Sequence, residues 1–367
     1  MLIDDPELRF LIALNHLPGV GPRVAKNLMA HCGSAQNIFE NDASFLAEIS
    51  GINRTLVPLR GKKEALKRAD EELEFIAAKQ VIVHSYLEAA YPERLKLCED
   101  GPLLLFQKGP LKLNNSRSLA VVGTRNATEY GRDFCDTLLL DLQELQPQII
   151  SGLAYGIDTA AHRGALRYRL PTIAVMAHGL DRVYPYLNRK LSEQILEQGG
   201  ALVTEFCSGT NPDRENFPKR NRIIAGMAEA TLVVEAGKKG GALITAELAN
   251  DYHREVFALP GDHNRPFSEG CNLLIKSHRA HLLTSAADLR YILGWEKKQA
   301  VQLPLDFELE NPEKALFDLI PLDRPGIELE VLSVKLNSPP GKVLANLMSL
   351  ELKGLIKALP GKRYCKN

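Results

Sequence analysis

The sequence lacks the cysteine patterns of metal-binding and thiol-redox proteins. Its six cysteines (32, 98, 135, 207, 271 and 365) include no C-x-x-C pair, and no histidine lies at metal-ligand spacing from them. No stretch approaches the ~20 apolar residues of a membrane span, and the acidic residues 1–7 have no signal-peptide pattern. We therefore expect a cytoplasmic protein with free thiols, no metal and no membrane association.

Two common nucleotide-binding motifs are also missing. The sequence contains neither G-x-G-x-x-G nor G-x-x-x-x-G-K-[ST], which disfavours dinucleotide oxidoreduction and P-loop hydrolysis, and no cofactor is expected. Charge of one sign is not in excess, because 45 Lys and Arg balance 45 Asp and Glu. Residues 335–367 are distinctly basic, with seven Lys and Arg against the single Glu351.

A short basic stretch is the feature around which the sequence is best understood. Residues 215–222 (ENFPKRNR) place three cations within four residues, and Pro218 stiffens the entry to a helical segment. Arginine binds phosphate as a bidentate fork and lysine as a point charge, and a helix start offers free N–H groups to an anion. The stretch therefore indicates a phosphate-binding loop and first helical turn. The alternative is a solvated basic helix start.

Strands and helices alternate from about residue 80 to residue 296. Apolar runs predict buried strands at residues 119–122, 149–150, 172–176, 201–204, 231–235 and 255–258. This alternation predicts an α/β domain with a doubly wound parallel sheet covered by helices on both faces. Ligands bind such sheets at the carboxyl ends of the strands. The segments expected at those ends are Gly123-Thr124-Arg125, Ser151-Gly152, Gly237–Gly241 and Pro260-Gly261.

Residues 1–79 are predicted to form a small all-helical domain. Two helices within residues 7–33 flank a hairpin whose Gly19 and Gly21 fit a helix-hairpin-helix (SAM-like) motif. Such glycines let backbone N–H groups approach a phosphate closely, and Lys26 could assist. A degenerate second copy is expected at residues 49–53. Whether this motif contacts DNA or serves only as a packing element stays open.

A linker is expected at residues 297–311, followed by a compact domain at residues 312–367. Helical patterns at residues 315–320, at 329–336 and from Pro340 onward precede a hairpin at residues 355–364. Three helices and a hairpin predict a winged helix, whose third helix and wing would carry the basic residues. Winged helices bind DNA or proteins, and the sequence leaves both partners open.

A series of ordered motifs extends over roughly residues 85–295. They are Val122–Arg125, Ser151–Asp158 with Ala161-His162, Gly179–Asp181 with Tyr184-Pro185, Phe217–Gly226, Val233–Ala236, Thr245-Ala246, Pro260-Gly261 and Gly270–Ile275. In these motifs the chain resembles the DprA/Smf family (DNA-processing protein A). The flanking helix-hairpin-helix and winged-helix domains also agree with longer members of that family.

The resemblance implies an extended Rossmann-like domain at residues 80–296 that binds single-stranded DNA. It implies a homodimer that delivers the recombinase RecA onto incoming strands in natural transformation, without catalytic activity. Single-strand-binding protein is a further candidate partner, and the family's dimer and recombinase contacts correspond loosely to residues 281–283 and 289–293. By motif position, the family's phosphate pocket falls on Gly123, Thr124, Arg125, Ser151, Gly152, Lys219, Arg220, Asn221 and Arg222, with Phe217 near a base.

Stacking of bases on aromatic faces would complete a single-strand site. Phe217 and Tyr155 are candidates for that role, and for Phe217 a place in the core is the alternative. A protein adaptor, in which the winged helix and the sheet edge bind proteins, is a further alternative. It predicts salt-insensitive partner binding and no effect of removing Lys219.

An enzyme is the alternative of a different class. Residues 240–247 resemble the glycine-rich segment of Rossmann-like nucleoside-monophosphate phosphoribohydrolases, in which a glutamate assists cleavage of an N-glycosidic bond. Glu247 would take that role, with Asp158 or His162 as its partner. However, residues 236–239 replace the Pro-Gly-Gly turn of those enzymes, and Asp158 can equally be a helix cap. We therefore expect no enzymatic activity.

Overall fold

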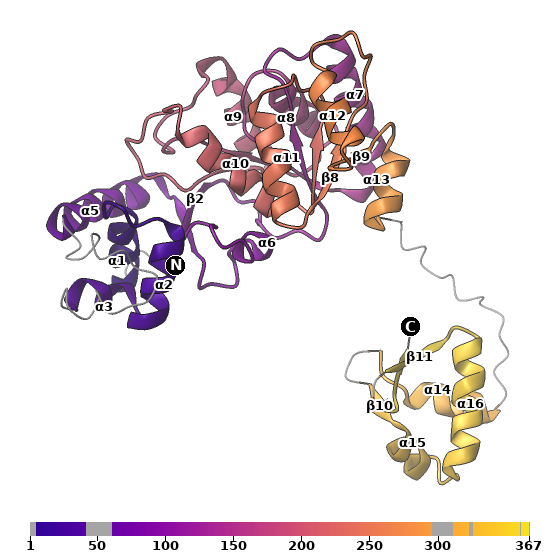
Figure 1. The fold of residues 1–367 in the computed structure, drawn as a ribbon. Helices are drawn as coiled ribbons and strands as arrows, with labels where there is room; N and C mark the ends of the chain where they lie inside the picture. Colours follow the sequence, from indigo (N-terminus) through magenta and orange to yellow (C-terminus); the bar gives the residue numbers. More distant parts are fainter. Residues whose placement is uncertain (1–4, 42–60, 296–310, 323–325, 360, 367) are drawn as a thin grey trace. The chain divides into compact units, whose positions relative to one another are not determined.

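The computed structural model describes residues 5–41, 61–295, 311–322, 326–359 and 361–366 (Figure 1). The chain divides into two compact units, residues 1–295 and 296–367. The helices before residue 80 belong to the first unit together with the α/β region. None of the helices in the described parts of the chain is long and apolar enough to cross a membrane.

A nine-stranded sheet organises the first unit, in the order β1-β2-β6-β5-β4-β3-β7-β8-β9. Every neighbouring pair from β6 to β9 is parallel, which confirms the predicted parallel α/β sheet. The sequence did not indicate the antiparallel pairing at the other edge, where β1 pairs with β2 and β2 pairs with β6. The strands are β1 (Ile82–Ser85), β2 (Leu104–Lys108), β3 (Ser118–Val122), β4 (Gln148–Ser151), β5 (Thr172–Val175), β6 (Ala201–Thr204), β7 (Ala230–Val233), β8 (Glu255–Ala258) and β9 (His281–Leu282).

Helices cover both faces of this sheet, as the buried strands require (Figure 1). Side chains alternate along a strand, so Leu119 and Val121 of β3 pack against α7, α8 and α13, whereas Ala120 and Val122 pack in the cluster that contains α10, α11 and α12. These helices are α6 (Glu93–Lys96), α7 (Glu129–Asp141), α8 (Ile157–Arg167), α9 (Arg189–Glu197), α10 (Asn216–Met227), α11 (Gly241–Asp251), α12 (Glu269–Lys276) and α13 (Ala286–Leu293).

The N-terminal helices begin where the sequence supplies capping groups. The Asp5 side chain accepts a 2.9 Å hydrogen bond from the Glu7 N–H at the start of α1, and Pro6 and Pro22 occupy first turns, where a missing N–H costs nothing. Apolar side chains of these helices share one core with α9 and the β1–β2 edge. The helices are α1 (Pro6–Asn15), α2 (Pro22–Cys32), α3 (Ala35–Glu40) and α5 (Lys62–Lys79).

The hairpin between α1 and α2 directs its cations onto the protein. Gly19 has φ +77°, which favours glycine. The Lys26 ammonium donates to the carbonyls of Cys98 (3.1 Å) and Glu99 (3.2 Å), and Arg23 forms a 3.0 Å ion pair with Glu99. These contacts favour the packing interpretation of the hairpin over DNA contact. The second copy expected at residues 49–53 lies outside the described residues.

The second unit contains three helices and a small antiparallel sheet in the order β10-β12-β11. Leu316, Leu332 and Leu347, one from each helix, are fully buried in its core. Nearly all of the predicted linker, residues 297–311, lies outside the described residues, and the winged-helix interpretation stays a prediction. The elements are α14 (Asn311–Leu319), β10 (Ile327–Glu328), α15 (Leu329–Lys335), α16 (Pro340–Leu352), β11 (Ile356–Leu359) and β12 (Arg363–Lys366).

Candidate nucleic-acid interface

The candidate site lies where the direction of chain winding reverses in the sheet. The chain proceeds from β3 through β4 and β5 to β6 on one side, then returns by α10 to place β7 on the other side of β3. Ligands bind open α/β sheets at such switch points, beyond the carboxyl ends of the strands. The loops after β3 and β7 are joined there by a 2.7 Å hydrogen bond from the Thr124 N–H to the Glu235 carbonyl.

A pocket of about 360 Å³ opens at this point. Six of the residues predicted from the sequence line it: Gly123, Thr124, Arg125, Phe217, Arg220 and Asn221. The other predicted residues, Ser151, Gly152, Lys219 and Arg222, are not among its lining residues. Residues that the sequence analysis did not assign to the phosphate site, notably Asp158, Lys239 and Thr245, complete the wall. The sequence offered one signal for Lys239, because this residue lies in the segment 237–241 that was expected at the carboxyl end of a strand.

Helix α10 exposes only its first turn to a ligand. Phe217 is half-buried and Lys219 is exposed, whereas every residue from Arg220 to Met227 is buried. The apolar side chains of Ile223 and Ile224 join the core beneath the sheet. Because the helix is enclosed after its first turn, the three cations of the basic stretch occupy different environments.

Arg220 is a buried cation that holds two strand ends together. Its Nη1 donates to the carbonyl of Gly152 (2.5 Å) and to that of Val175 (2.6 Å), and its Nε donates to the Asn221 side-chain oxygen (3.1 Å). Burial lowers its pKa to about 10, with the charge of Asp158 opposing that shift. Arg220 therefore stays charged at neutral pH and presents a fixed positive charge to the pocket floor.

Asp158 supplies the counter-charge at the start of α8. Its carboxylate accepts hydrogen bonds from the Gly152 N–H (3.1 Å) and the Ala154 N–H (3.3 Å). Burial raises the pKa of this carboxyl, and the nearby Arg220 charge opposes the increase. Gly152 leaves room for this arrangement, since a Cβ there would lie 2.1 Å from Nη1 of Arg220. Gly152 thus has a packing role.

Arg222 and Ser151 are likewise engaged within the protein. Arg222 is 8% exposed and forms an ion pair with Glu205, whose side chain is 13% exposed. Burial raises the pKa of Glu205, and the Arg222 charge counteracts that increase. Ser151 is fully buried and donates a 2.6 Å hydrogen bond to the Val121 carbonyl. Contact of either residue with a phosphate stays a prediction.

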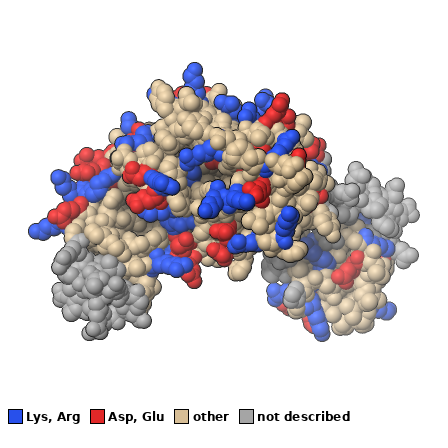
Figure 2. All heavy atoms as spheres, turned by 45° about the horizontal axis from the view of Figure 1, so that its top comes forward, with Lys and Arg blue, Asp and Glu red and all other residues tan. Residues whose placement is uncertain are grey.

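Three cations in and near the pocket remain available to a ligand. Arg125 and Lys239 line the pocket, and Lys219 lies in the first turn of α10 outside the lining. Arg125, Lys219 and Lys239 are exposed, and within the described residues none of them forms an ion pair. The Arg125 guanidinium lies 5.3 Å from the centre of the Phe217 ring. The centre of the Tyr184 ring lies 6.0 Å from that of Phe217, and the two rings are tilted relative to each other. Phe217 is therefore held by its neighbours with part of its surface open. On the face shown in Figure 2, basic and acidic side chains are mixed.

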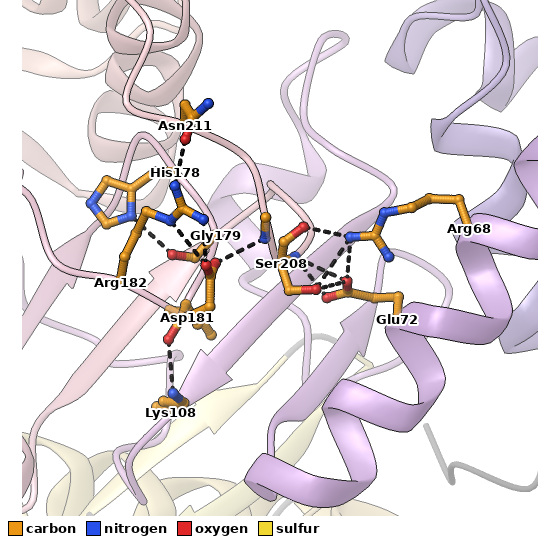
Figure 3. A network of polar contacts seen from close by, with 11 residues as sticks. Arg68, Glu72, Lys108, His178, Gly179, Asp181, Arg182, Ser208 and Asn211 are labelled. Atoms are coloured by element: carbon orange, nitrogen blue, oxygen red, sulfur yellow. Dashed lines mark hydrogen bonds and ion pairs between the residues drawn. The ribbon is translucent and has the colours of Figure 1, made fainter.

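The loop that leads into α10 is fixed from the N-terminal helices (Figure 3). Glu72 of α5 is buried and accepts hydrogen bonds from the Ser208 N–H (2.9 Å) and hydroxyl (2.6 Å). Arg68 donates to Glu72 at 2.8 Å and to the Ser208 carbonyl at 2.5 Å. From the other side, Asp181 accepts the Gly209 N–H at 3.0 Å. Helix α5 thereby positions the loop that leads into the first turn of α10.

The residues of the enzyme alternative are not assembled. Glu247 is exposed on α11, forms a 3.4 Å ion pair with Arg279 and does not line the pocket. His162 is fully buried, with its Nδ1 2.8 Å from the Thr172 hydroxyl, and burial together with the Arg220 charge lowers its pKa to about 3. The described residues contain no group of three or more His, Cys, Asp or Glu arranged to hold a metal ion. This geometry gives the phosphoribohydrolase hypothesis no support.

Comparison with known proteins identifies the family. A sequence model described as DNA recombination-mediator protein A matches residues 82–293. The chain belongs to this family. Protein Smf of Escherichia coli is 39% identical over 290 residues, which cover 74% of each chain. Protein Smf of Synechocystis is 32% identical over 98% of this chain and 99% of its own length. The resemblance stated from the sequence is thereby confirmed.

Solved structures of family members share the fold. DNA processing protein A of Streptococcus pneumoniae is 33% identical with a TM-score of 0.66, covering 77% of this chain and 97% of that one. DNA processing protein A of Helicobacter pylori is 28% identical with a TM-score of 0.52, covering 58% of this chain and 95% of that one. The Helicobacter pylori structure describes a single-stranded DNA binding mode of that protein.

Proposed function

We propose that this chain binds single-stranded DNA in the pocket at the β3–β7 switch point and acts as a recombination mediator. The observation that carries the proposal is the pocket itself, which is lined by Arg125, Lys239 and the half-buried Phe217, with the Arg125 guanidinium 5.3 Å from the centre of the Phe217 ring. Single-strand binding requires a cationic track for the backbone and an aromatic face for a base, and both are present there. The single-stranded DNA bound by the Helicobacter pylori relative supports the same ligand.

The predicted site residues divide into two groups under this proposal. Arg125, Lys219 and Lys239 contact backbone phosphates, and Phe217 contacts a base. Gly123 and Thr124 line the pocket and offer polar groups to the bound nucleotide. Asn221 also lines it, but its side chain already accepts from Arg220 and donates to the Gly241 carbonyl. The remaining residues, Ser151, Gly152, Arg220 and Arg222, build the pocket from beneath, because their polar groups are engaged within the protein.

The biological role follows from the family and is part of the proposal. A cytoplasmic mediator would deliver RecA onto the bound strand in natural transformation, with single-strand-binding protein as a further partner and without enzymatic turnover. A homodimer through the β9 edge is supported by the exposed side chains of Leu282 and Tyr291. Leu283 and Leu289 of the loosely predicted contact surface are fully buried in the core and would act only through packing.

The terminal units take different roles in the proposal. The N-terminal helices hold parts of the α/β region in place. Glu72 and Arg68 of α5 bind Ser208 in the loop before α10, and Lys26 of α2 binds the carbonyls of residues 98 and 99. The unit at residues 312–367 we interpret as a winged helix, whose exposed Lys342, on α16, could bind a second segment of DNA or a protein.

Fluorescence anisotropy with a labelled thymidine oligomer and a matching duplex tests the proposal across a salt series. We expect tighter binding of the single strand, with log K falling about 0.7 per neutralised phosphate for each unit of log salt. Lys219→Ala and Arg125→Ala should each weaken strand binding by about 1–2 kcal/mol. Lys112→Ala is the matched control, because Lys112 is exposed in the segment that enters β3 at the opposite end of the sheet.

The same titrations separate the alternatives. Equal affinity for duplex, unchanged by Lys219→Ala, would move DNA binding to another part of the chain. Binding of neither nucleic acid, together with release of base from a nucleoside monophosphate, would restore the enzyme hypothesis and refute the mediator proposal.

A further inference from the structure

A second groove adjoins the pocket on the side of α7 and α8. It has a volume of about 670 Å³ and runs along α8 as far as Arg167, beside the first two turns of α7. Arg125 lines both the pocket and the groove, and the neighbouring residues Ala154 and Tyr155 line one each. The two cavities therefore adjoin at Arg125.

The ridge between pocket and groove is built from two tightly packed loops. The Ile157 N–H donates to the Thr124 carbonyl at 3.2 Å. Gly156 has φ +76°, and a Cβ there would lie 2.2 Å from the Thr124 carbonyl oxygen. Because the loops are in contact and well ordered by these bonds, Arg125 and Tyr155 project from a fixed ridge and not from independent loops.

The groove is lined by more cations than acids. Four arginines (125, 132, 163 and 167) and two aspartates (133 and 136) line it. Arg167 forms a 2.6 Å ion pair with Asp136, so this pair adds no net charge to the groove. Arg163 is exposed on α8, and among the described residues it has neither an ion pair nor a side-chain hydrogen bond. Arg132 donates only to the Ala127 carbonyl, so its positive charge has no acidic partner within the same set of residues.

An aromatic face accompanies these charges. Tyr155 is 39% exposed in the loop before α8, and its hydroxyl has no hydrogen-bond partner among the described residues. An exposed tyrosine beside unpaired arginines supplies the same two elements as the pocket, a stacking surface and phosphate contacts.

We propose that the groove between α7 and α8 is a second subsite for the same DNA strand, with Arg163 and Arg132 on backbone phosphates and Tyr155 against a base. The proposal rests on the proposed function of the pocket, and Arg125 bridges the two subsites. It predicts that the strand continues from the pocket over the ridge onto α8. The affinity should therefore depend on strand length as well as on the pocket residues.

Anisotropy titrations with thymidine oligomers of increasing length test this inference on the full chain. The wild type should bind longer oligomers more tightly than an oligomer that only fills the pocket. In Arg163→Ala and Tyr155→Ala that gain should fall about tenfold, with affinity for the short oligomer unchanged. Arg163→Ala should also reduce the salt slope for the long oligomer by about 0.7. Lys112→Ala, at the opposite end of the sheet, should alter neither oligomer.

The outcomes distinguish this inference from the proposed pocket. If Lys219→Ala weakens binding of both oligomers and Arg163→Ala weakens binding of only the long one, the result supports both the pocket and the second subsite. A length-dependent gain that Arg163→Ala and Tyr155→Ala leave intact, or the absence of such a gain in the wild type, refutes the second subsite alone. Equal loss of both oligomers in Arg163→Ala also refutes it as a separate subsite. Short-oligomer binding that neither Lys219→Ala nor Lys239→Ala, which replaces a lining cation, changes refutes the pocket itself.

Discussion

Replacing Arg220 should mainly lower the stability of the domain. Replacing its neighbour Lys219 should instead weaken strand binding and leave the stability nearly unchanged. Arg220→Met keeps most of the side-chain volume but removes the donors to the carbonyls of Gly152 and Val175. Each buried carbonyl left unpaired costs about 1–3 kcal/mol. Asp158 also loses its compensating cation. Breaking a buried charge pair typically costs about 3–5 kcal/mol, and we expect a loss of unfolding free energy in that range.

The single tryptophan provides the assay. Trp295 is 3% exposed, packs in the core that includes β3, and donates a 3.1 Å hydrogen bond from its indole to Glu229, so its fluorescence reports on the sheet. Urea unfolding of the full chain should show the loss in Arg220→Met. The exposed Lys219→Met should stay within about 0.5 kcal/mol of the wild type.

A second substitution checks the cause of the loss. In Arg220→Met the carboxylate of Asp158 is buried without a cation, so Asp158→Asn in that background should recover part of the lost stability. The double-mutant cycle then gives a coupling energy of about 1–3 kcal/mol. Unchanged stability of Arg220→Met, combined with weakened strand binding, would show that Arg220 is a phosphate ligand and that the structural role assigned to it is wrong.

Three further perturbations have defined outcomes. Since the His162 pKa is lowered to about 3, the unfolded state gains a proton below pH 6.5 that the folded state does not; stability should fall by about 1.4 kcal/mol per pH unit as the pH decreases from 6.5, and urea midpoints should show a shallower dependence in His162→Gln. Gly152→Ala should cost more than about 2 kcal/mol by thermal unfolding, because its Cβ has no room, whereas Gly240→Ala, where nothing lies within 4 Å, should be near neutral. Glu72→Ala should speed amide hydrogen exchange at Ser208 and in the loop that follows, and unchanged protection there would contradict the anchoring role of α5.

Much of the central fold could be predicted from the sequence because it depends on local patterns of apolar residues. The apolar runs at residues 119–122 and 231–235 predict strands buried on both faces, and buried parallel strands require helices on both sides. The glycine-rich turns after them, at residues 123–125 and 237–241, could be assigned to one edge of the sheet for the same reason. The antiparallel edge was not predictable, because the pairing of β2 with β6 joins segments separated by about a hundred residues.

Only the tertiary structure decided which cations of the basic stretch are buried and which is exposed. Lys219, Arg220 and Arg222 are chemically similar and lie within four residues, so composition assigns them the same role. Which of them faces solvent depends on the angular position of each around α10 and on what surrounds that helix. Glu205 and the carbonyl of Gly152, which are distant in sequence, engage the two arginines.

The sequence by itself therefore determined the alternation of strands and helices, the family motifs and the end of the sheet at which a ligand is expected, because each follows from local periodicity or from the topology of parallel sheets. The tertiary structure decided which cations are free to meet a phosphate. A buried charge requires a partner and an exposed one does not, and that partner is brought to Arg220 and Arg222 only when distant strands and loops assemble.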